Sequence, residues 1–125
     1  MPAYSHIYFG QKSRQVNLAC TLSIRNTDIT RAIRVTSVDY YSTQGALVRS
    51  FVEKPQIVPP LGTLEIFIGE VDSEGGSGAN FIVRWDSAKP ANLPIVETVM
   101  IGLQSNLSIS FTSRGQPIRE ISTNE

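Results

Sequence analysis

Residues 72–81 hold the densest group of side chains that could do chemistry. The loop combines three glycines with oxygen-bearing side chains, which include Asp72, Glu74, Ser77 and Asn80. The glycines are Gly75, Gly76 and Gly78. One interpretation of this loop is a binding site for a small ligand. The ligand could be Ca²⁺, bound by Asp72, Glu74 and Asn80, because Ca²⁺ prefers carboxylate and amide oxygens on a flexible backbone. The spacing departs from that of an EF-hand loop, and carboxylates solvated at the end of a strand explain the same pattern more simply.

A phosphate site is a weaker interpretation of this loop. Glycine-rich loops bind phosphate with backbone N–H groups and the N-terminus of a following helix. Here a strand-like run follows at residue 81 and no lysine stands beside the glycines. The structural alternative is that Ser77 and Asn80 hydrogen-bond the backbone, while Gly75, Gly76 and Gly78 let the loop turn.

Glu97 is the one carboxylate set inside a strongly apolar run, residues 95–103. It could join the loop residues in binding a ligand. A buried carboxylate must otherwise pair with a cation or accept N–H bonds. A structural ion pair with Arg25 or Arg84 is therefore the favoured expectation for Glu97, ahead of a catalytic acid.

Catalysis by a nucleophile has little support. The single histidine, His6, lies among aromatic residues, and no carboxylate stands near it in the sequence to orient it as a base. Cys20 falls in the inward phase of a strand, where a buried apolar thiol is expected rather than a reactive one. One histidine and one cysteine do not make a transition-metal site. We therefore expect no catalytic residue, no cofactor and no enzyme.

Composition narrows the classes of partner. The chain of 125 residues has eleven basic and eleven acidic side chains, so no net charge directs it to nucleic acid. It has neither an apolar run long enough for a transmembrane segment nor the pattern of a signal peptide. Its size predicts one domain over residues 1–125, with a core from about 4 to 118 and a polar tail at 119–125.

Two-residue alternation predicts strands throughout. The clearest case is residues 16–25, where Leu18, Cys20 and Leu22 fall on one face and polar residues on the other. Prolines at 55, 59 and 60 should end a sheet, and Gly45 should sit in a hairpin turn. Seven to nine short strands without a helix predict an antiparallel β-sandwich, Ig-like in layout, with Trp85 plugging its core. A small β-barrel is the alternative.

Several runs together resemble a bacterial family known as domain of unknown function 3124. They cover about residues 4–118 and comprise the runs at 22–27, 39–45, 75–85, 97–102 and 110–115. The resemblance implies a periplasmic or lipoprotein-like location in the cell envelope and brings no activity with it. We therefore expect a non-enzymatic interaction module with a protein partner. Strand pairing at a sheet edge would also allow a homo-oligomer.

Overall fold

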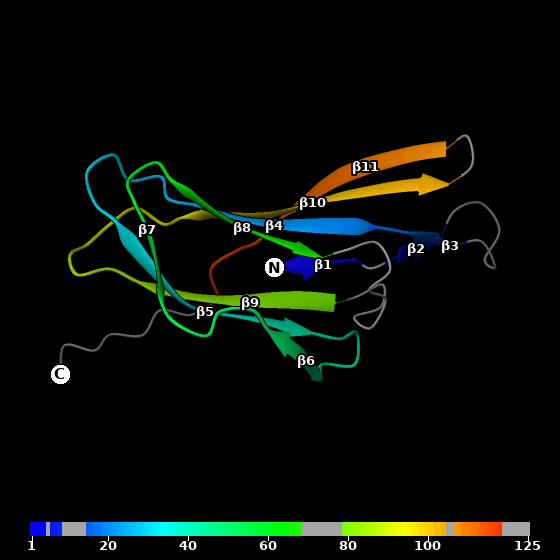
Figure 1. The fold of residues 1–125 in the computed structure, drawn as a ribbon, viewed down its shortest axis with the longest axis horizontal. Helices are drawn as coiled ribbons and strands as arrows, with labels where there is room; N and C mark the ends of the chain where they lie inside the picture. The colour runs from blue at the N-terminus through cyan, green and yellow to red at the C-terminus, as the bar shows by residue number, and fades with distance from the viewer. Residues whose placement is uncertain (5, 9–14, 69–78, 105–106, 119–125) are drawn as a thin grey trace.

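The fold was analysed in a computed structural model, which describes residues 1–4, 6–8, 15–68, 79–104 and 107–118. Two antiparallel sheets, of five and four strands, face each other without closing into a barrel (Figure 1). The predicted β-sandwich is confirmed, and its nine strands match the upper end of the predicted number. The described residues contain no helix with the length and apolar content needed to cross a bilayer.

The five-stranded sheet runs in the order β1, β9, β5, β6, and β7 also pairs with β5. Its strands are β1 (Pro2–Ala3), β5 (Ile33–Tyr41), β6 (Leu47–Ser50), β7 (Gln56–Val58) and β9 (Ala79–Asp86). The four-stranded sheet runs β11, β10, β4, β8. Its strands are β4 (Ala19–Arg25), β8 (Thr63–Ile68), β10 (Ile95–Gln104) and β11 (Leu107–Arg114). A short ribbon pairs β2 (His6–Tyr8) with β3 (Gln15–Asn17).

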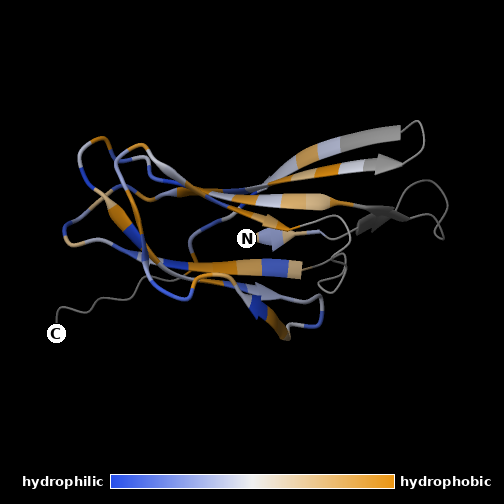
Figure 2. Cartoon of the chain, viewed as in Figure 1, coloured by the Kyte–Doolittle hydropathy of each residue, from blue (hydrophilic) through white to orange (hydrophobic). Residues whose placement is uncertain are grey.

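The apolar residues that alternate with polar ones in the sequence form the core of the sandwich, as predicted. Leu18, Cys20, Leu22 and Ile24 are all buried, because successive side chains of β4 point to opposite faces of its sheet. Met100 of β10 lies opposite Cys20 and is also fully buried. The apolar stripes of the two sheets run along their middle strands (Figure 2).

Aromatic rings fill the centre of the sandwich. The rings of Tyr40 and Phe81 have centroids 4.9 Å apart, and Phe51 packs beside Phe81 at 5.9 Å. Trp85, expected to plug the core, packs against it but is only partly buried. Tyr40 and Phe81 are buried more completely than Trp85, so this pair, and not Trp85, occupies the centre of the core.

The predicted turns also have the expected geometry. Gly45 has φ of 84°, which glycine adopts without strain, in the turn between β5 and β6. The chain crosses from the five-stranded sheet to the four-stranded sheet at residues 59–62, where two prolines had indicated a break. The sequence had not revealed β1 or β7, which are two and three residues long.

One side of the sandwich is closed by the N-terminus. Met1 exchanges two hydrogen bonds with Phe81, its amino group donating to the carbonyl oxygen and its carbonyl accepting from the N–H. The ring of Tyr4 packs edge-on against Phe111 of the other sheet, with centroids 5.8 Å apart. The opposite side, between β8 and the β6–β7 segment, carries no such bridge within the described residues (Figure 1).

A polar network around Asn26 joins two loops at one end of the molecule. The fully buried Asn26 amide donates to the carbonyl oxygens of Arg31, Val58 and Pro59 at 2.8–3.2 Å. Its own Oδ1 accepts from the N–H of Asp28. These bonds satisfy a buried amide completely and fix the loops at 26–32 and 59–62 against each other.

Candidate functional site

The predicted ligand loop lies almost wholly outside the described residues. This applies to Asp72, Glu74 and Ser77, and to the three glycines at 75, 76 and 78. Asn80 is described: it lies on β9 and is exposed. No group of three or more metal-ligating side chains occurs in the described parts of the chain.

Glu97 does not lie near Asn80. Glu97 belongs to β10 in the four-stranded sheet and Asn80 to β9 in the five-stranded sheet. Each alternates with a buried neighbour, Thr98 and Phe81 respectively, so both side chains point outward from opposite faces of the sandwich. The two predicted ligand residues are therefore separated by the core.

The expected ion pair of Glu97 is not formed. Arg84 pairs instead with Asp39 of β5, at 3.2 Å, and Arg25 lies opposite Ile95 rather than opposite Glu97. Glu97 is only partly buried, so its carboxylate can stay hydrated and does not require a paired cation. The prediction failed because the outer face of β10 is not covered.

Cys20 has the inert character predicted for it. The thiol is buried between the sheets, where loss of hydration raises its pKa to about 11. A thiolate is the reactive form, and such burial suppresses it at neutral pH.

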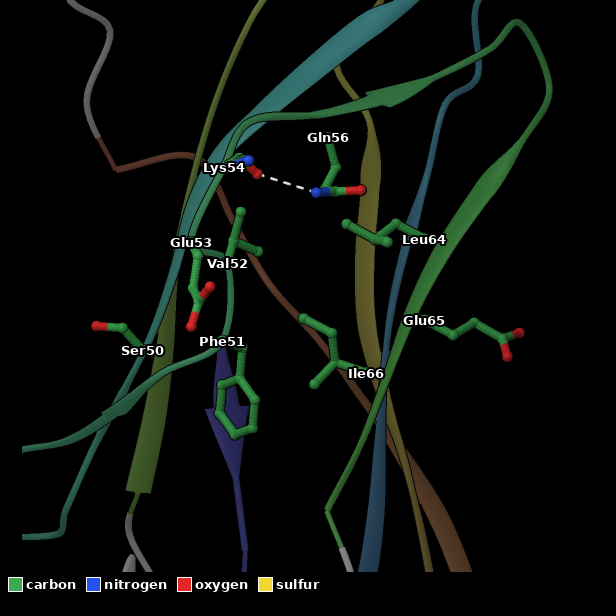
Figure 3. Close-up of a pocket in the computed structure, with 9 residues that line it drawn as sticks. All are labelled: Ser50, Phe51, Val52, Glu53, Lys54, Gln56, Leu64, Glu65 and Ile66. Atoms are coloured by element: carbon green, nitrogen blue, oxygen red, sulfur yellow. Dashed lines mark hydrogen bonds between the residues drawn. The ribbon is translucent and has the colours of Figure 1, made fainter.

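The open side of the sandwich holds a groove of about 480 Å³. Leu64 and Ile66 of β8 point into it from one wall, and Phe51 and Val52 face them from the segment after β6 (Figure 3). The side chain of Glu65 points away from the groove (Figure 3). The volume lies within the range of about 300–1,000 Å³ common for binding pockets.

The strand that forms one wall of the groove is an edge strand. Among the described strands β8 pairs only with β4. Directly beyond this ladder, the N–H of Asn26 donates to the carbonyl of Gly62 at 2.9 Å, while the N–H of Gly62 donates to Pro59. Asn26 and Gly62 thus stand at a hydrogen-bonded position of the ladder with one of its two bonds formed. Because such pairs alternate along an antiparallel ladder, Leu64 and Ile66 bond to β4. The N–H and C=O groups of Thr63, Glu65 and Phe67 then face the open side.

An apolar row on the outer face leads to the same edge. Phe67, with 67% of its surface exposed, lies opposite Thr21, and Thr21 lies opposite Val99 of β10. Val99 and its neighbour on that face, Ile101, are exposed as well. The row places an uncovered aromatic ring at the margin of the sheet, beside unpaired backbone groups.

A family model described as "Protein of unknown function (DUF3124)" matches residues 1–118. The chain belongs to this family. The comparison found no match among curated proteins and none among solved structures. The resemblance noted in the sequence is thus confirmed, and it supplies no site residues for the DUF3124 chain.

The groove residues of this DUF3124 chain were not singled out from the sequence. β6 ends at Ser50, and Phe51 and Val52 follow it as one wall of the groove. Alternation did show that Glu65 and Phe67 share the face opposite Leu64 and Ile66. Which strand lies at an edge depends on pairing between distant segments, and no local pattern reports it.

Proposed function

We propose that the protein is a non-enzymatic binding module that takes an extended segment of a partner protein along β8. The observation that carries this proposal is the free edge of β8 beside an apolar groove. An added strand gains backbone hydrogen bonds from the edge and specificity from the side chains that alternate along it. On the strength of the family resemblance alone, we extend the proposal to the bacterial cell envelope.

The backbone of β8 offers three residues to such a segment. The N–H and C=O groups of Thr63, Glu65 and Phe67 face the open side, spaced two residues apart as an incoming strand requires. Alternate side chains of the incoming strand would enter the groove against Leu64, Ile66 and Phe51. The remaining side chains would lie on the outer face beside Glu65 and Phe67.

The charge of Glu65 selects the partner. It is exposed, and it forms no ion pair with any other residue that the structure describes. A basic side chain opposite Glu65 is favourable across two strands, and an apolar one beside Phe67 extends the outer row. Two copies of this chain paired antiparallel and centred on Glu65 would instead set two carboxylates against each other. A different protein therefore fits the edge better than a second copy does.

The groove itself supports binding rather than chemistry. Its charged lining residues are Glu53, Lys54 and Glu65, and Glu65 points away from the others (Figure 3). Acid–base catalysis needs titratable groups that converge on one reacting atom. The groove has apolar side chains that face each other and backbone hydrogen-bonding groups along its rim. Both features favour the binding of an extended peptide.

The test uses two blocked synthetic peptides, one alternating valine with lysine and one alternating valine with glutamate. We expect the lysine peptide to shift the amide NMR signals of Thr63, Glu65 and Phe67 and to bind more tightly. Glu65→Lys should reverse the preference between the peptides, and Glu65→Pro should abolish binding by removing the central edge N–H. A Glu65→Lys variant that keeps the original preference contradicts the proposal, as does wild-type protein that binds neither peptide.

A further inference from the structure

Three loops meet at the end of the sandwich that contains the Asn26 network. They connect β4 to β5, β7 to β8 and β9 to β10, at residues 26–32, 59–62 and 87–94 (Figure 1). The N–H of Leu61 donates to the carbonyl of Asp28 at 3.2 Å, and the hydroxyl of Thr27 donates to the carbonyl of Leu93 at 3.0 Å. The Arg31 guanidinium also donates to the carbonyl of Pro90. Hydrogen bonds thus tie all three loops into one rigid surface.

Each of these loops exposes one large aliphatic side chain. Ile29, Leu61 and Leu93 have 75%, 64% and 60% of their surfaces exposed, and we call them the apolar tip. Apolar segments are visible between polar ones in the loops at this end (Figure 2). Leu61 holds φ of 60°, which is uncommon for a residue other than glycine. Leu61 therefore combines a strained backbone conformation with a solvent-exposed apolar side chain.

The charge around the apolar tip is positive. Arg31 and Lys89 are the basic residues of the three loops, and both are exposed. The only acidic residue there, Asp28, is nine-tenths buried, and its carboxylate accepts hydrogen bonds from Thr30, Arg31 and Asn92. The Asp28 carboxylate therefore points into the hydrogen bonds between the loops. The exposed charged groups around the three aliphatic side chains are the cations of Arg31 and Lys89.

We propose that this end of the molecule docks on an anionic lipid surface. Exposed aliphatic side chains can enter the acyl boundary of a bilayer, while nearby basic residues are attracted to anionic headgroups. The exposed apolar surface fits lipid better than protein, since it is aliphatic, with two of its three side chains leucines, and leucine is under-represented among protein hot spots. Because the loops bond to one another, insertion of the tip leaves few backbone groups to be desolvated.

The free edge of β8 belongs to a different surface. The apolar tip is formed by loops at the end of the sandwich, whereas β8 and the groove lie along its open side (Figure 1). Lipid docking at the tip would leave that side available. The inference is therefore independent of the proposed peptide binding.

The test is sedimentation of the protein with vesicles, comparing pure phosphatidylcholine with an equal mixture of phosphatidylcholine and phosphatidylglycerol at low ionic strength. We expect binding to the anionic vesicles. The triple variant Ile29→Ser, Leu61→Gly, Leu93→Ser should lower the apparent affinity by roughly tenfold or more, because it removes the apolar area that would leave water. Lys89→Glu should weaken binding and reduce its dependence on salt.

The matched control is Leu47→Ser, which removes an aliphatic side chain that is 57% exposed on β6, outside the three loops. It should bind vesicles as the unmodified protein does, and thermal melts should show that every variant is folded. Unmodified protein that ignores anionic vesicles overturns the proposal and points to a protein surface as the occupant of the tip. Equal loss of binding in the control and the triple variant overturns it too.

Discussion

The Asp28 carboxylate accepts a hydrogen bond from the backbone N–H of Asn92, 3.1 Å away and 64 residues along the chain. Its other oxygen accepts from the N–H groups of Thr30 and Arg31 and from the Thr30 hydroxyl. The N–H donors of Thr30 and Asn92 contribute most to lowering the pKa of Asp28 to about 2. The ionised Asp28 side chain thus adds to the Thr27–Leu93 and Arg31–Pro90 hydrogen bonds that join the loop between β9 and β10 to the loop between β4 and β5.

Acid should remove this contribution. The pKa of Asp28 is about 2 when folded and about 3.9 when unfolded, so its stabilisation is complete above pH 4 and is lost as the pH falls toward 2. We expect the gap in melting temperature between the unmodified protein and Asp28→Asn to narrow as the pH falls from about 5 to about 2. Asp86→Asn is the control: Asp86 bonds to Arg34 but is half-exposed, so its gap should be small throughout. A constant gap for Asp28→Asn would contradict the prediction.

Asn26 should be the most sensitive polar position of the fold. Asn26→Ala removes a hydrogen-bond donor from the carbonyls of Arg31, Val58 and Pro59, of which Pro59 keeps the N–H of Gly62. It also removes the acceptor for the N–H of Asp28. We expect a loss of about 2–4 kcal/mol in the free energy of unfolding, measured in urea. Thr27→Ala, which removes one exposed hydrogen bond, should lose less than about 1 kcal/mol. Equal losses would show that the network does not depend on the Asn26 amide.

The hydrogen bonds of the Asn26 network could not be predicted from the sequence. Two-residue alternation predicted β4, β9 and β11, because a strand with one buried face alternates apolar and polar side chains. No local pattern predicts the bonds of residues 26–28, since their partners at 58–62 and 92–93 are distant in sequence. Most of these partners are backbone carbonyl or N–H groups, which any residue supplies. The apolar tip was missed for the same reason, because its three side chains come from three separate loops.

The outer face of β10 shows a second limit. The strongly apolar run at residues 95–103 is typical of a strand covered on both faces, and β10 does lie between β11 and β4 in its sheet. Yet Val99 and Ile101 are exposed, because the structure places no further layer of described residues over them. The hydrophobic pattern of a strand shows which of its faces could be buried. It does not show which other part of the protein, or which partner, covers each face. The failed ion pair of Glu97 follows from the same misjudged face.

Cys20 should report on global unfolding. Burial raises the pKa of its thiol to about 11, so almost no thiolate is present at pH 8 in the folded state. We expect a thiol reagent such as dithionitrobenzoate to label the native protein only as fast as the protein unfolds, and the urea-unfolded protein at once. Labelling that is fast in native buffer, at a rate unrelated to unfolding, would contradict the buried position.

The direction of the backbone groups in β8 can be tested with proline. Ile66 bonds to β4, so Ile66→Pro should remove a ladder hydrogen bond and destabilise the fold by about 3 kcal/mol or more. Glu65 directs its N–H to the open side, so Glu65→Pro should cost no more than about 1 kcal/mol. Urea denaturation of both variants measures the difference. If Glu65→Pro proved the more damaging change, the assigned pairing would be reversed, and the edge would offer different residues to a partner.

Leu61 and Gly45 both have positive φ, at 60° and 84°, and they should respond in opposite directions to substitution. No atom lies within 4 Å of a Cβ placed on Gly45, so Gly45→Ala meets only backbone strain and should lower the free energy of unfolding by about 1–2 kcal/mol. Leu61→Gly relieves strain of the same kind but gives the unfolded chain more freedom, so it should raise stability by up to about 1 kcal/mol. Thermal and urea unfolding of both variants measure these changes. A marked loss in Leu61→Gly would mean that the leucine packs against the fold, and its place in the apolar tip would then be structural.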